Sequence, residues 1–238
     1  GPGQSPLIPD NAHQPSLAYV PYLLTGDRYY AEEMAFWANY AMIRTYPGDG
    51  VRSSSGVIEN NEVRGFGWGL RNIVDAAAMY PDASAVRSYL IAKVTNNLQW
   101  LDNYANAQDL TTNPFQILWL FERPDGKQFI SMWEQAYLMH AIDRARQQGF
   151  SGGLAHRDAI AKFQLKLFTS DPEYPRAQGA PYIVSVGVPG ATTTLSSFTF
   201  FTSMAQIWAG TQGQERPFAG YYGPEARMSL LVAIQNGW

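Results

Sequence analysis

Residues 62–80 carry four side chains suited to ligand chemistry on one face of a single predicted helix. They have the spacing i, i+4, i+7 and i+11, and they are Arg64, Trp68, Arg71 and Asp75. Guanidinium groups bind a carboxylate in a bidentate way, and an indole ring packs on the C–H groups of a sugar. The face predicts a pocket for an acidic sugar, lined by Arg64, Trp68 and Arg71. The alternative is that Arg64 and Arg71 pair with the nearby acids Glu62 and Asp75.

A second predicted helix repeats the same spacing with a different set of side chains. Its residues are Trp133, Tyr137, His140 and Arg144, and Glu134 borders them. Glu134 or His140 has a group that exchanges protons, and Tyr137 has one suited to a lyase. We therefore expect Glu134 and Tyr137 to be catalytic, and Trp133 and His140 to bind ligand. The alternative places Trp133 and Tyr137 in the core and Arg144 on the surface.

A third polar group precedes the first predicted helix and consists of Asn11, His13 and Gln14. Histidine is the side chain that most readily exchanges a proton near neutral pH, so His13 is a candidate acid or base. We expect Asn11 and Gln14 to bind ligand, and His13 to lie within hydrogen-bonding range of the Arg64–Trp68 face. The alternative is a helix-capping loop with an exposed histidine.

Helical periodicity dominates the elements that must position these groups. It predicts helices over about 16–24, 27–46, 62–80, 84–107, 127–148, 154–168, 197–209 and 224–234. We expect an extended segment over 1–12, and strand only in one hairpin over about 180–202, where β-branched residues gather. Three glycines within the central helix, Gly65, Gly67 and Gly69, each cost about 1 kcal/mol of helix propensity. Close approach by another helix or by a ligand is expected there.

Composition excludes several classes of function. The 238 residues carry a net charge of −3, with no long run of Lys or Arg, so no nucleic-acid partner is expected. The sequence has no apolar run near the roughly 20 residues of a membrane span. It has no cysteine, no metal-ligand spacing and no phosphate-binding loop, so we expect no metal and no cofactor.

Three segments resemble the helical hairpins of secreted (α/α)-toroid proteins that act on polysaccharides. They are LLTGDRYYAEEMAFWANYAM, EVRGFGWGLRNIVDAA and WEQAYLMHAIDRARQQGF, and the likeness covers roughly residues 10–170. The resemblance implies a mainly α fold: an incomplete (α/α) toroid of helical hairpins, with a small β-hairpin near the C-terminus. It also implies an oligo- or polysaccharide partner and an extracytoplasmic or secreted location. We expect one domain over 1–238, with fewer helices than a complete toroid, and other domains of a longer chain as further partners.

Two classes of function fit these features. The first is a carbohydrate-active enzyme, with lyase-type β-elimination on an acidic polysaccharide favoured over hydrolysis. A lyase would use Arg64 or Arg71 to neutralise the uronate, and His13 and Tyr137 as base and acid. A hydrolase would need two carboxylates across the scissile bond, drawn from Asp10, Glu62 and Glu134. The second class is a non-catalytic sugar-binding or structural domain with the same cavity.

Overall fold

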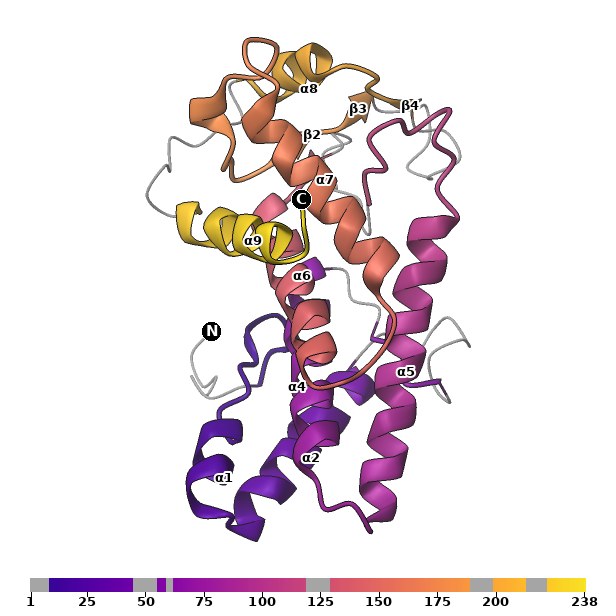
Figure 1. Ribbon diagram of the computed structural model, residues 1–238, viewed down its shortest axis with the longest axis vertical. Coiled ribbons are helices and arrows are strands. Elements are labelled where there is room, and N and C mark those ends of the chain that lie inside the picture. Colours follow the sequence, from indigo (N-terminus) through magenta and orange to yellow (C-terminus); the bar gives the residue numbers. More distant parts are fainter. Residues whose placement is uncertain (1–8, 45–54, 59–61, 119–128, 189–198, 213–221) are drawn as a thin grey trace, which may run out of the picture.

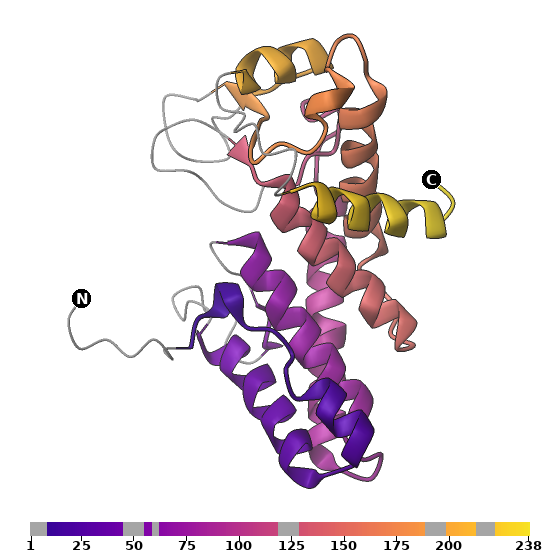
Figure 2. The ribbon, with the colours of Figure 1, turned by 90° about the vertical axis from the view of Figure 1, so that its left-hand side faces the viewer.

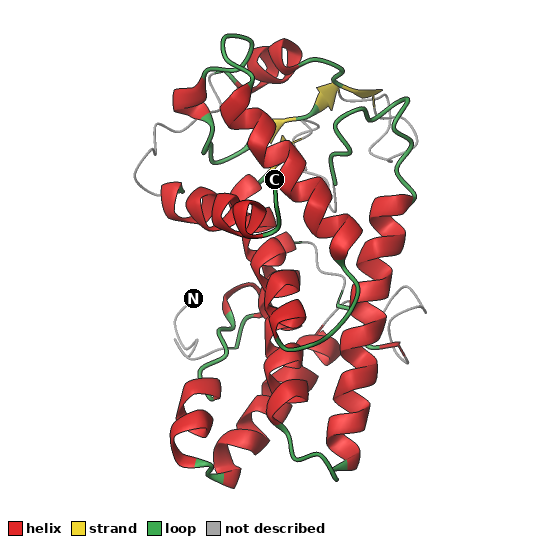
Figure 3. Ribbon diagram, viewed as in Figure 1, coloured by secondary structure: helices red, strands yellow, loops and turns green. Residues whose placement is uncertain are grey.

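The computed structural model describes residues 9–44, 55–58, 62–118, 129–188, 199–212 and 222–238, and this part of the chain is mainly helical (Figures 1 and 3). The longer helices are α1 (Tyr19–Thr25), α2 (Arg28–Arg44), α4 (Val63–Met79), α5 (Ala85–Asn106), α6 (Met132–Gln147), α7 (Leu154–Thr169), α8 (Met204–Thr211) and α9 (Gly223–Gln235). Two short 3-10 helices are η1 (Asn11–His13) and η3 (Arg176–Gln178). The predicted mainly α class is confirmed.

The strands form two small antiparallel pairs. β3 (Gly187–Val188) pairs with β4 (Thr199–Phe200), inside the range predicted for a hairpin. β2 (Val184–Ser185) pairs instead with β1 (Phe129–Ile130). The expectation that strand is confined to 180–202 is therefore wrong, and so is the expected start of a helix at 127. Phe129 and Ile130 are both buried, and their pairing partner is distant in sequence, so local periodicity could not reveal it.

The start of the described chain also departs from the extended segment that we expected. Residues 11–13 form η1, and Asp10 caps it by accepting a hydrogen bond from the Ala12 amide at 2.9 Å. Expectations for residues 1–8 lie outside the described residues.

Helix α4 is the central element of the lower half of the molecule and contacts η1, α2, α5 and α6 (Figure 1). Its apolar side is fully buried, as Leu70 and Ile73 show. A Cβ added at Gly67 would lie 2.9 Å from the backbone nitrogen of Leu138, and one added at Gly69 would lie 2.7 Å from Ile58. The expected close approach is confirmed, because the backbone of α6 comes against α4 at Gly67.

Two buried apolar clusters build the core, and α6 contributes to both. The lower cluster joins α2, α4 and α5 to α6 residues that include Leu138 and Ile142. The upper cluster joins α7, α8, α9 and the strands to Met132 and Met139. Figures 1 and 2 show α6 between the lower helices and the upper elements. Helix α6 therefore holds its polar residues in a fixed place relative to both halves.

Candidate functional site between helices α4, α6 and α9

A pocket of about 110 Å³ lies between α4, α6 and α9. Its lining side chains are Trp68 and Arg71 of α4, Tyr137 and His140 of α6, and Met228 of α9, with Gly67 and Ala141 completing the wall. The structure thus brings together four residues from the two helical faces that the sequence singled out. Met228 was missed, because nothing in the local sequence relates it to either face.

The two predicted faces lie against each other in register. Each member of the α4 face lies beside the member of the α6 face at the same level. The pairs are Arg64 with Trp133, Trp68 with Tyr137, Arg71 with His140, and Asp75 with Arg144. The residue numbers rise together along both helices, so α4 and α6 run parallel. We call this set of four pairs the α4–α6 ladder. The two middle pairs of the ladder line the pocket. In one of them, the rings of Trp68 and Tyr137 lie 5.0 Å apart.

The lowest pair of the ladder is an ion pair with a buried carboxylate. Asp75 is fully buried, and Arg144 Nε donates a hydrogen bond to its Oδ1 at 3.2 Å. Arg71 also forms an ion pair with Asp75, as the alternative interpretation of the sequence expected. Its Nε lies 3.7 Å from Asp75 Oδ2, and neither atom has a hydrogen-bond partner. The side chain of Arg71 is 34% exposed. Because Arg144 provides the hydrogen bond to Asp75, Arg71 retains donor capacity for an anion in the pocket.

The two titratable side chains from α6 in the pocket are both in the neutral form at neutral pH. Burial lowers the pKa of His140 below 6.5, and the charges of Arg71 and Arg144 lower it further against the opposing effect of Asp143 and Asp75. Burial likewise raises the pKa of Tyr137 above 10. The pocket therefore offers an imidazole that can accept a proton and a phenol that can donate one.

Arg64 and Glu134 lie one turn above the pocket and have structural partners. Arg64 forms an ion pair with Glu62 at 2.7 Å, and its guanidinium lies 5.3 Å from the ring centre of Trp133. Arg64 is not among the residues that line the pocket with Trp68 and Arg71; Glu62 and Trp133 hold it at the ladder's upper end. Glu134 is buried, and its Oε2 accepts a hydrogen bond from the Arg64 amide at 3.2 Å.

Glu134 therefore serves as the cap of α4. The N-cap residue of α4, Glu62, forms no side-chain cap of its own, and the first amides of a helix need acceptors. Burial raises the pKa of Glu134, whereas the hydrogen bond from Arg64 and its positive charge act in the opposite direction.

His13 lies near α4 but has a local partner. Its Nδ1 lies 2.5 Å from Asp10 Oδ2, and both side chains are more than half exposed. Element η1 contacts α4, and Asn72 of α4 donates a hydrogen bond to the Gln14 carbonyl at 2.9 Å. The hydrogen bond from His13 is the main cause of the lowered pKa of Asp10, to which the charge of Arg64 also contributes. Asn11 belongs to the same 3-10 helix, η1.

An aromatic cluster, which the sequence did not predict, adjoins the upper end of the ladder. The Trp133 ring stacks on Tyr182 at 6.0 Å and lies 5.3 Å from Tyr222. Tyr182 and Tyr222 come from segments far from α6 in sequence, so no spacing rule connects them. All three side chains are half-buried.

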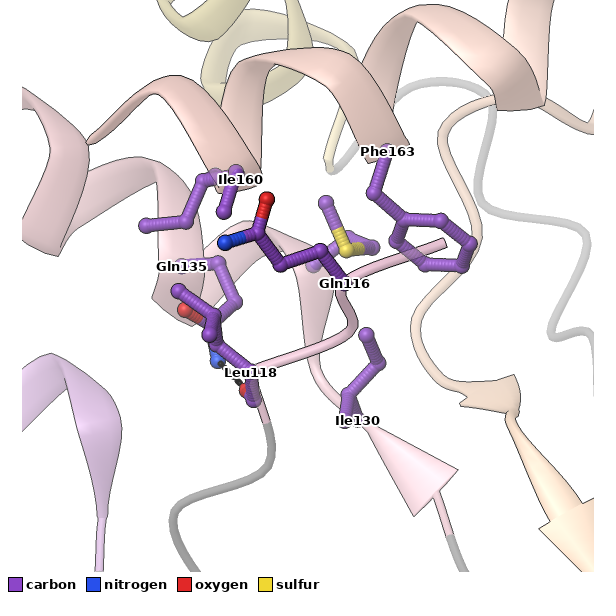
Figure 4. Close-up of a pocket in the computed structure, with 8 residues that line it drawn as sticks. Gln116, Leu118, Ile130, Gln135, Ile160 and Phe163 are labelled. Atoms are coloured by element: carbon purple, nitrogen blue, oxygen red, sulfur yellow. Dashed lines mark hydrogen bonds between the residues drawn. The ribbon is translucent and has the colours of Figure 1, made fainter. Parts of the chain in front are cut away.

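Two other cavities offer less chemistry. One, of about 10 Å³, is lined by Gln116, Gln135 and Phe163 among others, which Figure 4 shows; it has room for roughly one water. The other, of about 520 Å³, lies between the α1–α2 and α4–α5 turns. Its arginine, Arg28, already pairs with Glu32 at 2.6 Å. The α4–α6–α9 pocket is therefore the better candidate site.

Metal binding, membrane insertion and likeness to known proteins also bear on function. Among the described residues, no group of three or more His, Cys, Asp or Glu side chains is placed to hold a metal ion. In the same part of the chain, no helix has the length and apolar character to cross a membrane. Comparisons of the chain with family models, with curated proteins and with solved structures give no match.

Proposed function

We propose that the α4–α6–α9 pocket binds the carboxylate-bearing ring of an acidic oligo- or polysaccharide and that its side chains are suited to lyase-type β-elimination. One observation carries the proposal: Arg71, His140 and Tyr137 converge on a single pocket beside the indole of Trp68. A cation, a neutral base, a protonated acid and an aromatic face are the groups that this reaction on a uronate needs.

Each side chain has a distinct role. Arg71 pairs with the carboxylate and stabilises the negative charge that develops when the neighbouring carbon loses its proton. Neutral His140 accepts that proton, and the electron pair forms a carbon–carbon double bond as the glycosidic C–O bond breaks. Tyr137 donates a proton to the leaving oxygen. Trp68 packs on the C–H face of the ring.

The size of the pocket limits how much of the saccharide it holds. Ligand pockets commonly measure about 300–1,000 Å³, and this one measures about 110 Å³. It would take one ring at most, and the rest of a polymer would lie outside it. The half-buried rings of Trp133, Tyr182 and Tyr222 lie on one side and suit the neighbouring sugar units.

The toroid arrangement is part of the same proposal. Helices α4 and α6 run parallel and side by side, and α5, which follows α4, contacts α7, which follows α6. This alternation supports α4 and α6 as inner helices, and α5 and α7 as outer helices, of an incomplete (α/α) toroid. An extracytoplasmic location and covalently linked partner domains remain proposals that follow from the resemblance.

The test compares acidic and neutral polysaccharides as ligands and substrates, with calorimetry for binding and absorbance of the unsaturated product for turnover. We expect binding of a polyuronate, with Arg71→Gln weakening it at least tenfold. Tyr137→Phe should retain binding and lose turnover by about 10²-fold or more. Arg28→Gln is the matched control. It changes an arginine in the cavity between the α1–α2 and α4–α5 turns, and should behave as wild type. Equal binding of neutral and acidic polymers, or full affinity in Arg71→Gln, would overturn the proposal.

Non-catalytic sugar binding is the second candidate, and a specific observation favours it. Three of the four residues expected to be catalytic, His13, Arg64 and Glu134, have protein partners: Asp10, Glu62 and the amide of Arg64. Polyuronate binding by the wild type without any unsaturated product would decide for this function.

A further inference from the structure

Several buried polar atoms in and near the pocket lack hydrogen-bond partners. Arg71 Nε and Asp75 Oδ2 at least face each other in an ion pair, at 3.7 Å. Trp133 Nε1 and Glu225 Oε2, which are also screened from solvent, are left without any hydrogen bond. Buried polar groups in folded proteins nearly always have a partner, so each of these atoms needs an explanation. Trp133 Nε1 can only donate a hydrogen bond, and a carboxylate oxygen can only accept one.

Contacts around Tyr137 place both residues on the same side of the site. Trp133 lies in the first turn of α6, and its ring is 6.3 Å from that of Tyr137. Glu225 lies in the first turn of α9, whose N-cap Tyr222 has its ring 5.3 Å from that of Trp133. The charge of Glu225 also contributes to the raised pKa of Tyr137. Trp133 and Glu225 therefore both lie near Tyr137, where α6 meets α9.

The face of α9 that carries Glu225 is the one that borders the pocket. Met228 follows Glu225 by three residues, which puts the two on one side of the helix, and Met228 lines the pocket. Methionine is unbranched and adapts its shape readily, so the α9 wall of the pocket can adjust to a ligand. Arg227, on another side of α9, is exposed.

We propose that Trp133 and Glu225 form a hydroxyl-binding subsite that adjoins the pocket and binds a hydroxyl group of the saccharide whose carboxylate pairs with Arg71. A hydroxyl group both accepts and donates, so it would accept from Trp133 Nε1 and donate to Glu225 Oε2. The negative charge of Glu225 would repel a sulfate at the same position, so the subsite selects an unsulfated sugar. This inference rests on the proposed function.

The experiment uses two single-ring probes that share a ring carboxylate and differ in ring hydroxyls: galacturonate and tetrahydropyran-2-carboxylate. Binding of each is measured by calorimetry for wild type, Trp133→Phe, Glu225→Met, Arg71→Gln and the control Arg227→Gln. Trp133→Phe and Glu225→Met should each weaken galacturonate binding about tenfold and leave tetrahydropyran-2-carboxylate binding unchanged. Arg71→Gln should weaken the binding of both probes, and Arg227→Gln should change neither.

The outcomes separate this subsite from the proposed function. If Arg71→Gln loses affinity for both probes while Trp133→Phe and Glu225→Met bind them as the wild type does, the subsite would be overturned. The proposed acidic-sugar pocket would be supported. Binding of neither probe by the wild type would overturn both. A readout without ligand is the free energy of unfolding of Glu225→Met, which should fall by no more than about 1 kcal/mol, because only the interaction of the charge with the start of α9 is lost. A loss well above that would mean that Glu225 has a structural partner, and would also overturn the subsite.

Discussion

His140 and Tyr137 lie one turn apart on α6, and burial shifts their pKa values in opposite directions, to below 6.5 for the imidazole and above 10 for the phenol. Both shifts favour the uncharged form, as desolvation requires. The sequence predicted that these two residues share one face of a helix, because their spacing matches the helical period.

The sequence also offered Glu62 as a partner of Arg64, and the structure shows that ion pair. The sequence could not predict that Trp133 lies against Arg64 or that Glu134 accepts from the Arg64 amide. Those contacts depend on how the start of α4 meets α6, which no local pattern encodes.

The pH dependence of turnover tests the role of His140. A general base must be unprotonated to accept a proton. A lowered pKa means that His140 stays unprotonated down to a lower pH. The acidic limb of kcat/KM on a polyuronate should therefore lie below pH 6.5, the ordinary pKa of histidine. His140→Asn should lose turnover by about 10²-fold or more and retain binding through Arg71. An acidic limb at or above pH 6.5 would rule out His140 as the base.

At the scale of elements, close contacts between helices and caps that one helix provides for another fix the helices around the pocket. Glu134 of α6 caps α4, and Asp102 of α5 accepts hydrogen bonds from the amides of Gly153 and Ala155 at the start of α7, at 2.8 and 2.9 Å. The sequence located most helices well because their start signals are local: Ser84, for example, caps α5 by accepting from the Val86 amide. It did not locate β1, whose partner β2 is remote.

Gly67→Ala tests the close approach of α4 and α6. The new Cβ would lie 2.9 Å from backbone atoms of Tyr137 and Leu138, which cannot rotate away. We expect a loss of about 1–3 kcal/mol in the free energy of unfolding, despite the better helix propensity of alanine. Gly223→Ala is the matched control, because a Cβ added there would have nothing within 4 Å. Urea denaturation of both variants gives the comparison, and equal stability would contradict the packing described for Gly67.

Glu134→Ala and Glu134→Gln test whether that carboxylate is a cap or a catalytic group. Alanine leaves the first amides of α4 without their acceptor, at a cost of about 1–3 kcal/mol in the free energy of unfolding. Glutamine keeps a carbonyl acceptor, so it should retain most of the stability and the wild-type turnover. Loss of turnover in Glu134→Gln, at unchanged stability and ligand affinity, would instead give Glu134 a catalytic role.

At the scale of the whole molecule, the two apolar clusters that the described residues form meet across α5, α6 and α7, and His156 lies at this junction. It is fully buried on α7, and its Nδ1 lies 3.3 Å from the carbonyl of Leu101, a member of the lower cluster. Its ring lies 6.0 Å from that of Tyr104, which packs against the upper cluster. The sequence predicted the helices on both sides, but not that this histidine would be dry, since burial depends on the association of all three helices. Protonation of His156 would therefore place a buried charge where the two clusters meet, which would destabilise both.

The last prediction is that His156 makes the whole fold sensitive to acid. Burial lowers its pKa from 6.5 to about 3. Between these values the unfolded chain binds the proton and the folded chain does not, so stability is highest above pH 6.5 and falls as the pH decreases toward 3. This histidine alone should cost about 2 kcal/mol in the free energy of unfolding between pH 7 and pH 5. Urea denaturation at both pH values, compared with the non-titrating variant His156→Gln, isolates its share from that of the other titrating groups. The variant should lose less stability over this range than the wild type by about that amount. An identical loss in the two proteins would mean that the imidazole is not held neutral, and that the junction between the two clusters admits either charge or water.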